Sequence, residues 1–107
     1  EFIWMREHDT LCPSHAHLLG RVQALANDRP IYLTVDLDYF DPAFVPGTGT
    51  PEPGGESFQS FVSLCAVLMR KNLVGADVVE LAPNIDPTGN SDVFAAKVVR
   101  ELLLILS

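Results

Sequence analysis

The chain has 107 residues, of which 48% are hydrophobic and 20% are charged, a composition typical of an ordinary globular domain. Its 14 acidic and 7 basic side chains give a formal net charge of −7, which disfavours nucleic acid and anionic membranes as partners and suits a metal or a cationic ligand. The longest aliphatic run, Leu102–Leu106, is too short to cross a bilayer. We therefore expect one small domain, or part of one, with no membrane span.

Two cysteines, Cys12 and Cys65, stand far apart, with no CxxC spacing and no secretory signal before them. This arrangement favours reduced thiols in a cytoplasmic protein over a disulfide. The sequence starts at Glu1 and enters the apolar run Phe2–Met5 at once, which is typical of the middle of a domain. We therefore expect residues 1–107 to be a fragment, whose functional site is completed by residues outside it.

Apolar periodicity along the chain predicts strands that alternate with helices. The expected elements, in order, are a strand at 2–6, a helix capped by Ser14, a strand at 31–35, a helix from Ser57, a strand at 76–82 and a helix capped by Ser91. Gly75 is expected to mark the break before the last strand, and Arg70 and Lys71 fall where a helix C-terminus favours positive charge. This βαβαβα order predicts an α/β fold with a parallel sheet.

Three acidic side chains fall at the predicted carboxyl ends of strands. Asp36 and Asp38 follow the apolar strand at 31–35, and Glu80 lies near the end of the next strand. Asp36 and Asp38 are two apart, so on an extended strand they point to one face and repel each other unless a cation lies between them. Because ligands of parallel sheets bind outside the carboxyl ends of strands, we expect the functional site here.

Carboxylate oxygens are hard ligands, and two of them can flank divalent ions such as manganese or magnesium. The simpler interpretation is that Asp36 and Asp38 only cap a turn. A calcium-binding EF-hand loop is excluded, because its fifth, sixth and twelfth positions, counted from Asp36, are Phe40, Asp41 and Gly47. A phosphatase of the haloacid dehalogenase type stays open as an alternative, although Phe40 stands where that family usually has threonine.

The stretch TVDLDYFDPAFVPGTGTPEPGG, residues 34–55, closely resembles the signature of the ureohydrolase family, the arginases and agmatinases. The family pattern is DxDxxDP followed by PGTGTPxxGG, and the likeness continues through GADVVELAPNIDPTG, residues 75–89, into the last helix. The wording of both stretches is more similar to agmatinases than to true arginases. The resemblance implies that residues 1–107 are the C-terminal part of a single ureohydrolase domain with a three-layer α/β/α fold.

The resemblance also implies a chemistry. Asp36 and Asp38 match the family's metal-binding aspartates, which hold two manganese ions, and Glu80 matches the glutamate that pairs with the substrate guanidinium. Thr50 matches a position near the substrate, whereas Asp41 is expected to shape the loop. The implied reaction is hydrolysis of a small guanidino compound, agmatine first among them, to urea and an amine. The family is typically oligomeric, so a homo-oligomer is expected of the full-length protein.

The histidine motifs that supply the family's other metal ligands are not in this sequence. His8, His15 and His17 stand in other contexts, and we expect the last two to be surface residues of the first helix. No complete catalytic set is therefore expected in these 107 residues, and the chain alone is expected to be inactive. A non-catalytic association module built on the same scaffold is the remaining alternative.

Overall fold

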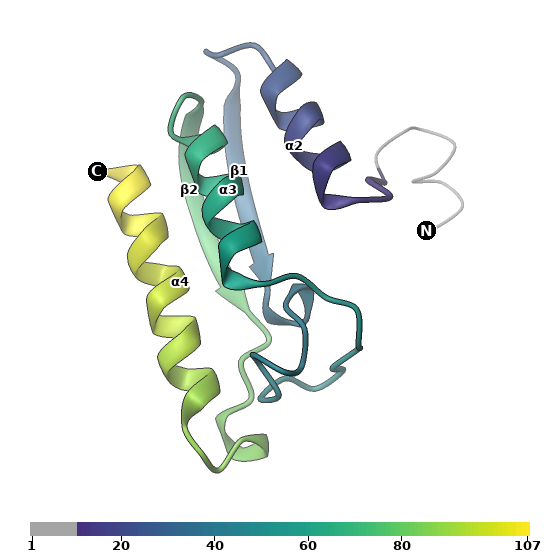
Figure 1. The fold of residues 1–107 in the computed structure, drawn as a ribbon. Coiled ribbons are helices and arrows are strands. Elements are labelled where there is room, and N and C mark those ends of the chain that lie inside the picture. Colours follow the sequence, from purple (N-terminus) through teal and green to yellow (C-terminus); the bar gives the residue numbers. More distant parts are fainter. Residues whose placement is uncertain (1–10) are drawn as a thin grey trace.

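The computed structural model describes residues 11–107, which form three helices, two strands and two short 3₁₀ turns (Figure 1). The elements, in chain order, are α2 His15–Ala24, β1 Pro30–Asp36, η1 Leu37–Tyr39, α3 Phe58–Leu68, β2 Asn72–Val79, η2 Pro83–Ile85 and α4 Asn90–Leu106. The strand expected at residues 2–6 lies outside the described residues. Within residues 11–107, no helix combines the length and the apolar character that a membrane crossing needs.

Serine side chains cap the first two described helices. The Ser14 hydroxyl accepts a hydrogen bond from the His17 N–H at 3.1 Å, as predicted for the start of α2. Ser57 caps α3 in the same way. The prediction that Ser91 caps α4 is wrong: the cap is Gly89, whose φ of 77° is left-handed, and Ser91 lies buried in the first turn.

The two strands pair in parallel, as predicted, and Asp36 at the end of β1 lies opposite Val79 at the end of β2. Gly75 does not break the chain before β2, because it lies inside the strand, where the register shifts between Ile31 and Tyr32. The Tyr32 ring covers this position: a side-chain carbon on Gly75 would stand 2.9 Å from it. β2 therefore starts and ends earlier than the predicted 76–82, and Glu80 falls just beyond it.

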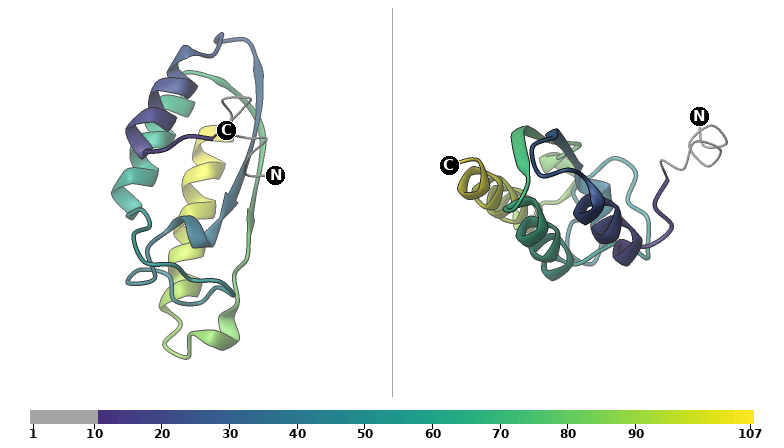
Figure 2. Two further views of the ribbon diagram at one scale, coloured as in Figure 1. Left: turned by 90° about the vertical axis from the view of Figure 1, so that its right-hand side faces the viewer. Right: turned by 90° about the horizontal axis from the view of Figure 1, so that it is seen from above.

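All three described helices cover the same face of the sheet (Figure 2). α4 packs on β2, and α3 packs between α4 and α2. The sequence pattern explains this arrangement, because alternate β1 residues Ile31, Leu33 and Val35 are half-buried or buried whereas Tyr32 is 61% exposed on the other face. Of the three layers expected, the described residues form the sheet and one helical layer.

The core lies between this helical layer and the carboxyl half of the sheet. Its fully buried aromatic side chains are Phe40, just after β1, and Phe61 on α3, whose rings meet edge to face with centroids 5.8 Å apart. Val98 and Leu102 of α4 complete the cluster. Because Phe40 stands two positions after Asp38, the core anchors the segment that carries both carboxylates.

Candidate active site

The two aspartates lie where β1 ends, but they do not share a strand. β1 stops at Asp36, and residues Leu37–Tyr39 turn into the 3₁₀ helix η1. One carboxylate oxygen of Asp36, Oδ1, accepts a hydrogen bond from the Asp38 N–H at 3.1 Å and so caps this turn. The expectation that both side chains share one strand face is therefore wrong, and the turn-capping interpretation holds for one oxygen of Asp36.

Thr50 reaches Asp38 from the proline- and glycine-rich loop that follows. Its hydroxyl donates to Asp38 Oδ2 across 3.1 Å, although the two residues stand 12 positions apart in the chain. Burial raises the pKa of the Asp38 carboxyl, as do its hydrogen bond with Asp36 and the negative charges of Asp36 and Glu80, whereas the Thr50 hydroxyl lowers it. Negative charge is therefore crowded at this edge of the sheet, and a bound cation would relieve it.

Glu80 follows the last residue of β2 and has an unusual backbone conformation. Its φ is 70°, and it is the one residue other than glycine with positive φ in the part of the chain that the structure describes. Such a conformation costs energy for a residue with a side chain, and it is concentrated at functional sites. Because Val79 lies opposite Asp36, Glu80 follows directly beside the end of β1. Its carboxylate is exposed at the same edge as the aspartates.

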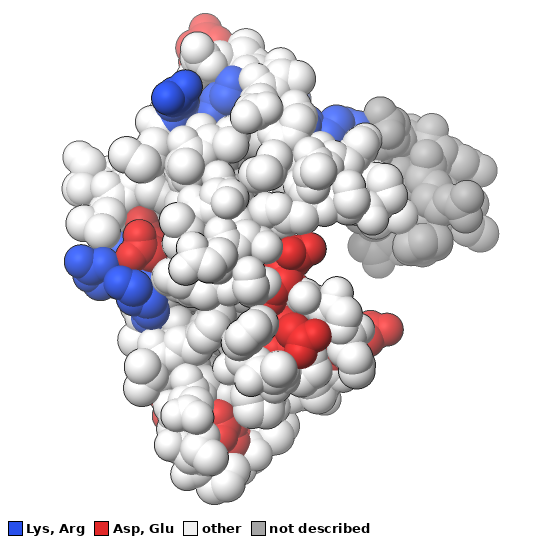
Figure 3. Space-filling view, in the orientation of Figure 1, with Lys and Arg blue, Asp and Glu red and all other residues white. Residues whose placement is uncertain are grey.

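Acidic side chains gather beside the hollow on the right of the molecule, whereas the lysines and arginines in view lie on its upper part and along its left side (Figure 3). The ion pairs found among residues 11–107 join Lys97 and Arg100 to Glu101 on α4. None of them involves the carboxylates of Asp36, Asp38 or Glu80 in the described chain. The carboxylates at this edge therefore take no part in the ion pairs found among residues 11–107.

Asp41 shapes the loop, as expected. Its two carboxylate oxygens accept hydrogen bonds from the backbone N–H groups of Ala43, at 2.8 Å, and Gly54, at 3.0 Å. These bonds lower the pKa of the Asp41 carboxyl. Gly55 permits the same close packing, because a side-chain carbon there would stand 2.6 Å from the Asp41 nitrogen. Asp41 therefore joins the two ends of the loop through its side chain.

The oxygen donors of Asp36 and Asp38 fit a manganese ion, but they do not form a complete set. No group of three or more His, Cys, Asp or Glu side chains suited to a metal occurs within residues 11–107. His15 and His17 are half-buried rather than surface residues, and His15 lies beside the Tyr39 ring, with centroids 6.2 Å apart. His8 lies outside the described residues.

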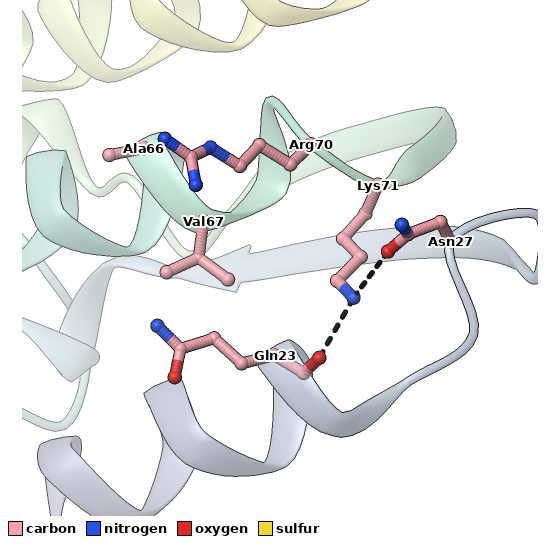
Figure 4. A pocket seen from close by; sticks show the side chains of 6 residues that line it. All are labelled: Gln23, Asn27, Ala66, Val67, Arg70 and Lys71. Carbon is pink, nitrogen blue, oxygen red and sulfur yellow. Dashed lines mark hydrogen bonds between the residues drawn. The ribbon is translucent and has the colours of Figure 1, made fainter.

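Two pockets lie away from the carboxylate cluster or reach it only at one end. A pocket of about 320 Å³ between α2, β1 and α3 is lined mainly by apolar side chains and touches Asp36 and Tyr39. A larger one of about 530 Å³ lies at the amino end of the sheet (Figure 4). There Lys71 donates to the backbone oxygens of Gln23 and Leu25 and to the Asn27 side chain, and so closes the C-terminus of α2.

Sequence reasoning missed a buried polar cluster next to the site. Asp86 is 5% exposed and Ser91 is fully buried; the Ser91 hydroxyl donates to Asp86 and accepts from the N–H of Gly47 in the loop. The spacing of Asp86 and Thr88 indicates a local turn. Nothing in the sequence pattern pairs Ser91 with Gly47, because 44 positions separate them.

Comparison with known proteins decides the family. Residues 1–105 match the model of the arginase family. The chain belongs to the arginase family. It is 45% identical over 78 residues to an agmatinase of Halalkalibacterium halodurans, covering 71% of this chain and 27% of that protein. It is also 43% identical over 88 residues to an agmatinase of Salmonella paratyphi B, with 82% and 29% covered.

The solved structures agree with this assignment. The proclavaminate amidino hydrolase of Streptomyces clavuligerus is 34% identical, with a TM-score of 0.78 over 87% of this chain and 31% of that one. The expected arginase-like α/β fold is therefore confirmed. The chain spans less than a third of the length of the curated relatives that it matches. The family match gives the phosphatase alternative no support.

Proposed function

We propose that this chain is the C-terminal part of a longer ureohydrolase, which hydrolyses a guanidino compound to urea and an amine. One observation carries the proposal: in a chain of the arginase family, Asp36, Asp38 and Glu80 meet at the carboxyl ends of β1 and β2 without a basic partner in the described chain. An electron-rich edge of this kind suits a substrate that is itself a cation, together with a metal.

Glu80 is the residue proposed to bind the guanidinium. A guanidinium is planar and permanently charged, and its N–H groups pair with a carboxylate through two parallel hydrogen bonds. Glu80 is exposed, and its left-handed backbone conformation sets the direction of its Cα–Cβ bond. Both features suit a carboxylate that binds a ligand. Thr50, expected to touch the substrate, already donates its hydroxyl proton to Asp38, so its oxygen is left to accept from a guanidinium N–H.

Asp36 and Asp38 are proposed to hold manganese through their carboxylate oxygens. Asp36 Oδ1 caps η1 and Asp38 Oδ2 accepts from Thr50, and a bound metal would replace the hydrogen bond that the two carboxyl groups share. Manganese, when bound, supplies Lewis acidity to the hydrolysis. The remaining ligands, including histidines, would come from a part of the longer protein outside these residues.

Agmatine is the proposed substrate, because the two curated relatives named above are agmatinases at 43–45% identity. A relative named for proclavaminate shows that the same scaffold serves other amidino compounds. The described cysteines are free, which suits the proposed cytoplasmic location. α4 leaves Val93 72% and Leu103 62% exposed, and contacts within a homo-oligomer or with the rest of the enzyme would cover this apolar surface.

The test is urea release by the full-length enzyme with added manganese. Agmatine, arginine and 4-guanidinobutyrate are offered in parallel, and we expect urea from agmatine at the highest kcat/KM. Urea from one of the other two compounds alone would overturn the substrate assignment but keep the reaction. Failure to release urea from any of the three, in a protein with bound manganese, would overturn the proposed reaction and favour an association module.

A further inference from the structure

Within residues 11–107, a buried carboxylate next to the site receives its hydrogen bonds from two residues. Asp86 Oδ1 accepts from the N–H of Thr88 at 3.1 Å and from the Thr88 hydroxyl. Asp86 Oδ2 accepts from the N–H of Ser91 at 2.9 Å and from the Ser91 hydroxyl at 2.6 Å. These bonds, that of the Ser91 hydroxyl first, lower the pKa of Asp86 to about 2, so the carboxylate is ionised at neutral pH.

The direction of the Ser91 hydroxyl proton follows from this charge. An ionised carboxylate can only accept, so the proton of Ser91 Oγ points to Asp86. The lone pairs of the same oxygen are then free to accept, and the Gly47 N–H donates to them at 2.8 Å. Ser91 is fully buried, so water does not compete for this bond. The Ser91 hydroxyl therefore links Asp86 to the loop, because it donates to Asp86 and accepts from Gly47.

The loop backbone lies flush against this link. A side-chain carbon on Gly47 would stand 2.7 Å from both Cβ and Oγ of Ser91 and 3.1 Å from Cβ of Asp86. Such distances are too short for any residue with a Cβ to keep the present backbone. Glycine is thus needed at position 47 for close approach, and its φ is not in the left-handed region.

The backbone carbonyl of Gly47 contacts the segment after β2, which carries Glu80. Its carbonyl oxygen accepts from the Ala82 N–H at 2.8 Å. Gly47 stands three positions before Thr50, which contacts Asp38, and Ala82 stands two positions after Glu80. One residue, held from behind by Ser91, therefore connects the segment that orients the metal-site aspartate to the segment that presents Glu80.

We propose that Ser91, held by Asp86, is a positioning residue that sets the distance between the Asp38–Thr50 pair and Glu80. It acts through Gly47 and does not touch the substrate. The inference rests on the proposed function for its kinetic consequence, since the distance matters only if Glu80 binds the guanidinium. Loss of the link should loosen substrate placement more than metal binding.

The experiment compares Ser91→Ala with Thr88→Ala in the full-length enzyme. Both variants remove a hydroxyl that donates to Asp86, but in the described chain only Ser91 also accepts from Gly47. We expect Ser91→Ala to raise the KM for agmatine and the inhibition constant of free guanidinium about tenfold, with unchanged manganese content. Thr88→Ala should change both constants less than twofold.

Equal KM and inhibition constants in the two variants would overturn the inference, and so would a loss confined to kcat. If Ser91→Ala does not fold, hydrogen–deuterium exchange of the wild-type enzyme replaces it. The amide of Gly47 should then exchange slowly, and exchange at the rate of a free loop amide would contradict the link. This readout does not depend on catalysis, so it separates failure of the link from failure of the proposed function, which the urea assay on wild type reports.

Discussion

Polar groups gather at both ends of the sheet, but the two ends differ in whether their charged side chains are paired within the described chain. At the amino ends, the Lys71 ammonium donates to three oxygens, from Gln23, Leu25 and Asn27, at 2.6 to 2.9 Å. At the carboxyl ends, Asp36, Asp38 and Glu80 lie near enough for the charges of Asp36 and Glu80 to raise the pKa of Asp38, and no ion pair of the described residues includes them. A charge satisfied by its own chain stabilises the fold, whereas charge left without a partner is available for a ligand.

The pockets repeat this contrast. The larger one, at the amino end, is lined by Lys71 and Arg70 together with polar and small side chains (Figure 4). Its size alone does not make it functional, because its lysine is already committed to the C-terminus of α2. The carboxylate edge is a better candidate for chemistry, since its carboxylates form no ion pair within residues 11–107. Substitutions at the carboxyl end should therefore lower activity more than stability, and substitutions at the amino end should lower stability more than activity.

Asp38→Asn should have the largest effect on activity. It removes the charge of a proposed metal ligand, and since even outer-shell partners change metal affinity or activity roughly 10- to 100-fold, we expect a loss of more than about 100-fold in kcat. Manganese content, measured by atomic absorption, should fall with it. The matched control is Asp28→Asn, an exposed aspartate near the amino end. A variant with full manganese content and wild-type kcat would remove Asp38 from the metal site.

Lys71→Met should show the opposite pattern. It leaves the C-terminal oxygens of α2 without their charged donor, so we expect the free energy of unfolding to fall by about 1–3 kcal/mol. Denaturant unfolding of the full-length protein checks this value, with Arg70→Met as the control because Arg70 is exposed on the same turn. The KM for agmatine should stay within twofold of wild type. A large KM change with unchanged stability would contradict a structural role for this end.

Thr50→Val should give the smallest effect. It removes the hydrogen bond from the Thr50 hydroxyl to Asp38 Oδ2 while nearly keeping the side-chain volume, and such a bond to a charged group contributes about 1.5–3 kcal/mol at most. We expect kcat/KM to fall about tenfold, and Thr50→Ser, which keeps the hydroxyl, should recover most of it. If serine were no better than valine, the hydroxyl would not be what Thr50 contributes.

The carboxylate edge could be predicted from the sequence, because the pattern of apolar residues shows where the strand before it ends. Apolar periodicity and β-branched residues marked β1, Asp36 is its last residue, and Asp38 stands two positions later. The boundaries of β2 were wrong for a tertiary reason: Gly75 can stay inside the strand because the Tyr32 ring of β1 packs over it. A glycine that usually ends an element was in this case required by a neighbouring strand.

The geometry within the site was less accessible to prediction. A spacing of two residues suggested a shared strand face, but the Asp36 side chain captures the Asp38 N–H and turns the backbone into η1. The Ser91 prediction failed because Gly89 takes the capping position, which frees the serine to bind Gly47. The first outcome depends on a local hydrogen bond from a side chain to the backbone two positions away, and the second on a contact between segments 44 positions apart. Neither is encoded in periodicity and spacing.

The affinity of free guanidinium for the manganese-loaded, full-length enzyme tests the central claim most directly. Titration calorimetry should compare wild type with Glu80→Gln and with Glu52→Gln, an exposed glutamate of the neighbouring loop. We predict that the dissociation constant rises about 10- to 100-fold in Glu80→Gln, because a charge-assisted pair is lost, and stays unchanged in Glu52→Gln. Equal affinity in all three proteins would contradict the claim that the carboxyl-end edge recognises a guanidinium through Glu80.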